Sequence, residues 1–127
     1  MQELKRLIDL AKYKNEIDIK REEEKFMNPN WLLDSIRDEV EEVREEVKPN
    51  NVAHLEDELS DILWGWMVLV EKLKHSEYVG SHEDIMKRAL KKYEERILPL
   101  KGDGDDHLIW REVKARQKKA LKEESRV

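Results

Sequence analysis

Few helix-breaking residues interrupt this chain of 127 residues, which contains only three prolines and four glycines. They leave long uninterrupted segments, in which apolar residues recur at the three- and four-residue spacing of one helix face. Charged residues make up 43% of the chain, a content typical of long solvated helices rather than of a turn-rich β fold. We therefore predict an all-α protein, an antiparallel bundle of four to five helices in a single domain.

The breakers and the capping residues set the expected helix boundaries. The predicted helices are residues 2–26, 29–47, 52–74, 81–97 and 106–123. The short turn at residues 48–51 requires the second and third helices to run antiparallel. We take residues 28–97 as the core of one domain that spans residues 1–127, with residues 98–127 as a C-terminal extension that ends in a basic helix.

The third predicted helix, residues 52–74, is apolar nearly all the way round in its second half. Trp64, Met67 and Val68 lie off its main apolar stripe. A helix of this kind must be covered on two sides, and we do not expect one small domain to supply both covers. We therefore predict a homo-oligomer, a dimer or a tetramer, that associates through this helix.

Composition excludes several classes of function. The chain has no cysteine, so it has no disulfide, thiol nucleophile or thiolate metal site. The longest apolar run, residues 62–70, is far shorter than the ~20 residues of a membrane span, so we expect a soluble, cytoplasmic protein with no membrane partner. The net charge of −5 makes nucleic acid an unlikely partner. We interpret the basic residues after residue 110 as a solvated terminal helix, and we rank nucleic-acid binding through residues 111–126 last among the possible functions.

Two acidic pairs share a spacing of three residues: Glu39 with Glu42, and Glu58 with Asp61. Residues three apart lie on one helix face. At about 100° per residue, both pairs fall beside the apolar stripe of their helix, on flanks that antiparallel pairing brings to the same side. The inner acids lie about eight residues from the middle of the turn and the outer acids about eleven, which is ~16 Å along the helix. The four carboxylates are therefore expected to converge at one level.

Such a cluster repels itself unless a cation neutralises it. Ligands that are all oxygen suit a hard divalent ion, Mg²⁺ first and Mn²⁺ second. The Glu-x-x-His ligands of di-iron bundles are absent, which argues against redox iron. The alternative interpretation is an ordinary solvated acidic face. Gly65, one turn beyond Asp61, is expected to leave space for a ligand beside this edge.

Three segments resemble the MazG-type nucleoside triphosphate pyrophosphohydrolases of the all-α NTP pyrophosphatase superfamily. They are residues 31–43, 54–63 and 92–97. The first two carry the signature of that family, Glu-x-x-Glu followed after a gap by Glu-x-x-Asp. Two positions depart from the family pattern, because Ser60 replaces a usual glycine and the doubled acid that opens the first motif is Asp38-Glu39 rather than Glu-Glu.

The resemblance implies Mg²⁺-dependent hydrolysis of a nucleoside or deoxynucleoside triphosphate to the monophosphate and pyrophosphate, with house-cleaning of the nucleotide pool as one role. The implied metal ligands are Glu39, Glu42, Glu58 and Asp61. Asp38 or a ligand such as Glu39 would orient or deprotonate the attacking water, and the sequence leaves that choice open.

The resemblance also places Lys92 and Arg96 at the family's basic positions, where they could hold the β and γ phosphates. The alternative interpretation of these two residues is that they form surface ion pairs with Glu94 or Glu95. Trp31 is the best aromatic candidate for stacking on a base. The alternative is that its ring only packs against other side chains. A competing hypothesis from another class is a non-catalytic helical oligomer that serves as a partner-binding module.

Overall fold

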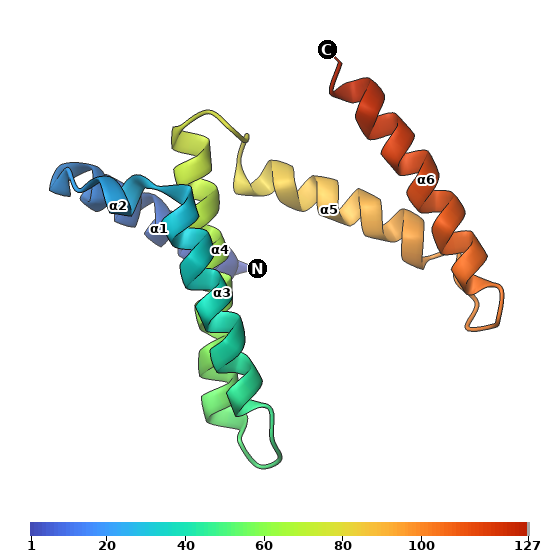
Figure 1. Ribbon diagram of the computed structural model, residues 1–127, viewed down its shortest axis with the longest axis horizontal. Coiled ribbons are helices and arrows are strands. Elements are labelled where there is room, and N and C mark those ends of the chain that lie inside the picture. The colour runs from blue at the N-terminus through green and yellow to red at the C-terminus, as the bar shows by residue number, and fades with distance from the viewer. Residues whose placement is uncertain (127) are drawn as a thin grey trace. The chain divides into compact units, whose positions relative to one another are not determined.

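The computed structural model describes residues 1–126, apart from the side chains of residues 24 and 26, and these residues form helices and no strand (Figure 1). The helices are α1 (Gln2–Arg21), α2 (Glu24–Met27), α3 (Pro29–Glu46), α4 (Val52–His75), α5 (His82–Ile97) and α6 (Asp106–Glu124). The predicted all-α class is confirmed. Among the described residues, no helix has the length and apolar content that a membrane crossing requires.

The chain divides into two compact units, Met1–His82 and Glu83–Val127. The first unit contains α1 to α4, and the second contains α6 and all of α5 after its first residue. The prediction of one domain over the whole chain stays a prediction, and its last residue lies outside the described part.

Polar caps at both ends of α3 build an antiparallel hairpin from α3 and α4 (Figure 1). The Asn28 side chain accepts a hydrogen bond from the backbone N–H of Asn30 at 2.9 Å, which starts α3. After α3, Asn50 takes a left-handed conformation with φ of 56°. The Asn51 side chain then donates to the backbone carbonyl of Glu46 at 2.8 Å and closes the turn. The chain therefore reverses where the sequence predicted.

Helix α1 packs against α4 in the first unit. Met67 and Val68, which lie off the main stripe of α4, are 0% and 5% exposed, and Ile8 and Ala11 of α1 are also buried. The expectation that the chain cannot cover α4 on two sides is therefore wrong, because α1 supplies the cover that we assigned to a second copy. Association through α4 itself stays a prediction.

A buried polar network ties α1 to α4. The Lys72 ammonium donates to Asn15 Oδ1 and to Asp18 Oδ2, each at 2.7 Å, and the Lys72 and Asp18 side chains are each 1% exposed. Burial alone would raise the pKa of Asp18, but the hydrogen bonds from Lys14 and Lys72 outweigh it and lower that pKa. Burial lowers the pKa of Lys72. The network selects one register of α1 on α4, because any other register would leave buried charges unpaired.

In the second unit, α5 and α6 meet through Arg96. Its Nε donates to Gln117 Oε1 at 2.7 Å, and its guanidinium lies 5.4 Å from the centre of the Trp110 ring. The apolar side chains of Leu90 and Tyr93 in α5 are 62% and 47% exposed. The reason is that α5 contacts α6 through the face that carries Arg96, not through the face that carries Leu90.

Candidate metal centre

The α3–α4 hairpin brings the four predicted carboxylates together. Glu39, Glu42, Glu58 and Asp61 each offer one oxygen atom, and these four atoms all lie within 4.8 Å of one another. Glu42 is exposed, whereas the other three are half-buried. The predicted convergence of the four side chains is confirmed, and the short turn explains it because it aligns the two pairs at the same distance from its centre.

Gly65, which follows Asp61 by one turn of α4, has a role in packing. A Cβ atom at this position would lie 2.9 Å from Cγ1 of Ile36 in α3. The space that we expected to be left for a ligand is therefore filled by Ile36, and that expectation is wrong. The missing side chain lets α3 approach α4 closely beside the carboxylates.

The electrostatics of the cluster favour protonation or a cation. Hydrogen bonding with Glu42, then burial, then the charges of Glu42, Asp61 and Glu58 raise the pKa of Glu39 from 4.5 to about 7. Burial, followed by hydrogen bonding with Glu42 and the neighbouring negative charges, raises the pKa of Glu58. Both residues have a buried Oε2 atom without a hydrogen-bond partner. The cluster therefore holds more negative charge than its surroundings compensate.

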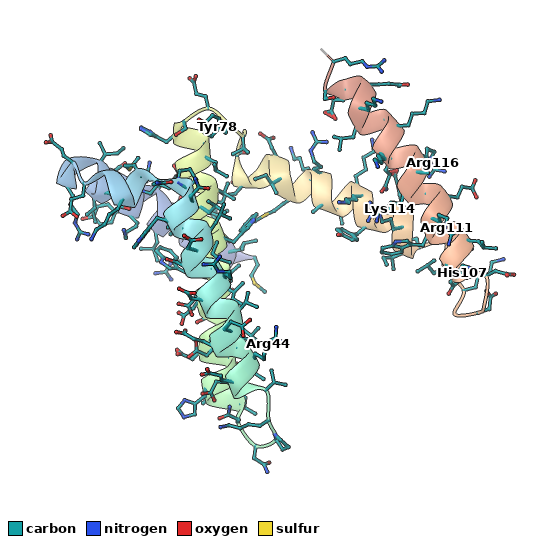
Figure 2. All side chains as sticks on the ribbon, viewed as in Figure 1. Arg44, Tyr78, His107, Arg111, Lys114 and Arg116 are labelled. Atoms are coloured by element: carbon teal, nitrogen blue, oxygen red, sulfur yellow. The ribbon has the colours of Figure 1, made fainter. Side chains whose placement is uncertain are left out.

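No basic side chain compensates this charge within residues 1–126, because none of the salt bridges there includes a member of the cluster. Arg44 of α3 (Figure 2) is engaged elsewhere, with its Nε 3.2 Å from Glu41 Oε2. The cluster places four carboxylate oxygens in one small volume, and two of its members have a buried oxygen without a hydrogen-bond partner. This donor set fits a hard divalent cation such as Mg²⁺ or Mn²⁺.

Two further acids flank the two carboxylate pairs. Asp38 is exposed and precedes Glu39 in α3. Asp57, which was not among the predicted site residues, contributes negative charge that helps to raise the pKa of Glu58. The signal was present in the sequence, since both motifs begin with a doubled acid, Asp38-Glu39 and Asp57-Glu58.

The remaining predicted site residues lie outside the cluster. Trp31 is 42% exposed in the first turn of α3, eight residues before Glu39. Lys92 and Arg96 lie in α5, in the second unit. Lys92 is exposed, with its Nζ 5.5 Å from the centre of the Tyr93 ring.

The expected alternative for these two basic residues is not observed. Arg96 is 9% exposed and donates to Gln117. In the described part of the chain, neither Lys92 nor Arg96 forms a salt bridge with Glu94 or Glu95.

Comparison with known proteins places the hairpin in a family. A family model described as the MazG nucleotide pyrophosphohydrolase domain matches residues 27–97, which include the whole of α3, α4 and α5. Neither the comparison with curated proteins nor that with solved structures found a match. The matched segment holds all four carboxylates and extends over more than half of the chain. The chain therefore belongs to the MazG nucleotide pyrophosphohydrolase domain family.

Proposed function

We propose that this protein hydrolyses nucleoside or deoxynucleoside triphosphates to the monophosphate and pyrophosphate in a reaction that depends on Mg²⁺. The observation that carries the proposal is the uncompensated cluster of four carboxylates, which lies inside the segment matched by the family. A triphosphate brings several negative charges to its binding site, so an acidic cluster can accept it only together with a cation.

Glu39, Glu42, Glu58 and Asp61 would hold the ion, with Mn²⁺ as a substitute for Mg²⁺. The ion, when bound, neutralises phosphate charge and lowers the pKa of a water molecule. In the reaction a water oxygen attacks the α phosphorus, the bond from that phosphorus to the α–β bridging oxygen breaks, and pyrophosphate leaves.

A carboxylate must accept the proton of the attacking water. Asp38 is exposed and lies outside the ligand set, so it keeps a free carboxylate while the ion is held. Glu39 is the second candidate, because its carboxylate belongs to the cluster in which the ion and its water would be held. Asp38→Asn tests the choice. If Asp38 is the base, this variant should bind the metal but lose turnover. If Glu39 is the base, the variant should keep both, because Glu39 is then the residue needed for metal binding and turnover.

Contacts to the rest of the substrate come from residues outside the cluster. We assign Lys92 and Arg96 to the β and γ phosphates and Trp31 to the base. Lys92 is exposed, and the Arg96 guanidinium is held in one orientation by Gln117 and by the Trp110 ring. A guanidinium fixed in this way loses little conformational entropy when it binds a phosphate.

Self-association through the hairpin is part of the proposal. Leu59 and Leu63 of α4 are 49% and 40% exposed, and Leu33 and Val40 of α3 are 48% and 41% exposed. At about 100° per residue these side chains fall on the flank away from the acidic pairs, so a second copy could cover them without closing the metal site. Sedimentation should show a dimer or tetramer that Leu63→Glu dissociates, and a monomeric wild-type protein would contradict this assignment.

The experiment is a turnover assay over the common ribo- and deoxynucleoside triphosphates with and without Mg²⁺, with pyrophosphate and orthophosphate measured separately. Glu58→Gln removes one ligand, and Glu45→Gln is the matched control, because Glu45 is exposed on α3 and lies outside the cluster. We expect pyrophosphate release that requires Mg²⁺, that Glu58→Gln abolishes and that Glu45→Gln preserves. Absence of turnover by a folded protein that binds Mg²⁺ would support the partner-binding module instead.

A further inference from the structure

Helix α6 carries a row of cationic side chains along one face. Arg111, Lys114, Lys118 and Lys122 follow one another at intervals of three and four residues, and all four are exposed. At about 100° per residue they fall within an arc of roughly 80°, and the row is ~16 Å long. Figure 2 labels Arg111 and Lys114 on this helix. The cations are therefore a continuous surface, which we call the basic face of α6.

The basic face has no counter-charge in the described part of the chain. The stretch from Arg111 to Lys122 contains six cationic residues and a single acid, Glu112. Within residues 1–126, the one salt bridge of α6 joins Glu124 to Arg88, with Arg88 Nη2 2.9 Å from Glu124 Oε1. The excess of positive charge on α6 contrasts with the chain as a whole, whose net charge is −5. Repulsion among the unpaired cations opposes a bare basic face and favours an anionic partner.

The chemistry beside the row narrows the class of partner. Two apolar residues of α6 are turned away from it: Val113 is 5% exposed, and the Trp110 ring contacts Arg96 of α5. Leu108 and Leu121 are 51% and 55% exposed, but thirteen positions separate them, so they form no continuous apolar stripe. The row therefore has no aromatic platform on which unpaired bases could stack, as single-strand binders use. It also lacks the adjoining apolar stripe with which an interfacial helix enters a membrane.

We propose that the basic face of α6 binds the phosphate backbone of a duplex nucleic acid without reading its sequence. A duplex presents a rigid, regular array of phosphates that a row of cations can neutralise with no contact to the bases. The proposal takes up the function that the sequence analysis ranked last, in preference to a merely solvated helix. The inference is independent of triphosphate hydrolysis, because it uses residues of α6 alone.

The test measures fluorescence anisotropy of a labelled 20-base-pair DNA duplex with the full-length protein in EDTA, between 50 and 200 mM NaCl. Four phosphate contacts release about four counterions, so affinity should fall roughly 10²-fold over this range. One variant neutralises the basic face, and a matched control neutralises four exposed cations of α1. The basic-face variant is Arg111→Gln, Lys114→Gln, Lys118→Gln and Lys122→Gln. The control is Lys5→Gln, Arg6→Gln, Lys12→Gln and Lys20→Gln.

We expect at least a tenfold weaker affinity in the basic-face variant than in the control, with unchanged circular dichroism and unchanged nucleotide turnover. Glu58→Gln should bind the duplex like the wild type, so failure of the hydrolase proposal would leave this one standing. The proposal is overturned by no binding at 50 mM NaCl, by equal losses in the two variants, or by equal or tighter binding to a single strand, poly-glutamate or anionic vesicles.

Discussion

Replacing Glu39 by glutamine should stabilise the metal-free protein while removing its response to Mg²⁺. The pKa of Glu39 is raised from 4.5 to about 7, so the folded state favours the protonated carboxyl. Stability is therefore lost as the pH rises from about 4.5 to about 7, and the full penalty applies above that range. Glutamine carries no charge at any pH and can donate a hydrogen bond to Glu42. The variant thus escapes the penalty at pH 8.

The magnitude follows from the size of the shift. Its upper limit is about 3 kcal/mol, at 1.36 kcal/mol for each pKa unit. Because Glu39 is half-buried and Glu42 is exposed, solvent screening reduces the effect to about 1–2 kcal/mol. For a chain of this length, that raises the melting temperature by about 4–8 °C.

The assay is thermal unfolding followed by far-UV circular dichroism at pH 5 and pH 8, in EDTA and in 10 mM Mg²⁺. At pH 8 in EDTA, Glu39→Gln should melt above the wild type, and at pH 5 the difference should fall to about a quarter of that at pH 8. Mg²⁺ should raise the melting temperature of the wild type and hardly that of the variant. Glu45→Gln should behave as the wild type throughout. A variant that is no more stable in EDTA at pH 8, or that keeps the full Mg²⁺ response, would refute the reasoning.

Three further substitutions test contacts that hold the fold together. Lys72→Met leaves the buried Asp18 with one cationic partner and should lower the free energy of unfolding in urea by about 2–4 kcal/mol. Adding Asp18→Leu should recover much of this loss, and a double variant without recovery would contradict the ion-pair explanation. Gly65→Ala places a methyl group against Ile36 at a packing cost of about 1–3 kcal/mol, of which the helix propensity of alanine returns about 1 kcal/mol. A variant that is more stable than the wild type in the same assay would contradict the close approach of the two helices. Arg96→Met should speed amide hydrogen exchange in α5 and α6 and leave exchange in α3 unchanged. Exchange rates in α5 and α6 equal to those of the wild type would contradict a structural role for the contacts of Arg96.

The hairpin and the cluster could be predicted from the sequence because local rules determine both. A short turn between two periodic apolar stripes fixes the antiparallel pairing, and that pairing places Glu39 and Glu42 opposite Glu58 and Asp61. No long-range information was needed, since the inner acids are close to the turn.

Other features depend on contacts that leave no periodic signal. The buried pair of Asp18 and Lys72 joins residues 54 positions apart, and in a chain that is 43% charged neither residue stands out. The packing role of Gly65 depends on the Ile36 rotamer, and the outward position of Leu90 depends on where α6 meets α5. Helical periodicity specifies a face but not the element that covers it.

The most direct test of the central claim is phosphorus-31 NMR of the products formed from a triphosphate with Mg²⁺ in water enriched in oxygen-18. We expect a monophosphate that carries the heavy oxygen and an unlabelled pyrophosphate, because water attacks the α phosphorus. The products should be absent with Glu58→Gln. A nucleoside diphosphate together with labelled orthophosphate would show that water attacks the γ phosphorus, and a label in the pyrophosphate would show attack at the β phosphorus. Either result would contradict the assigned reaction.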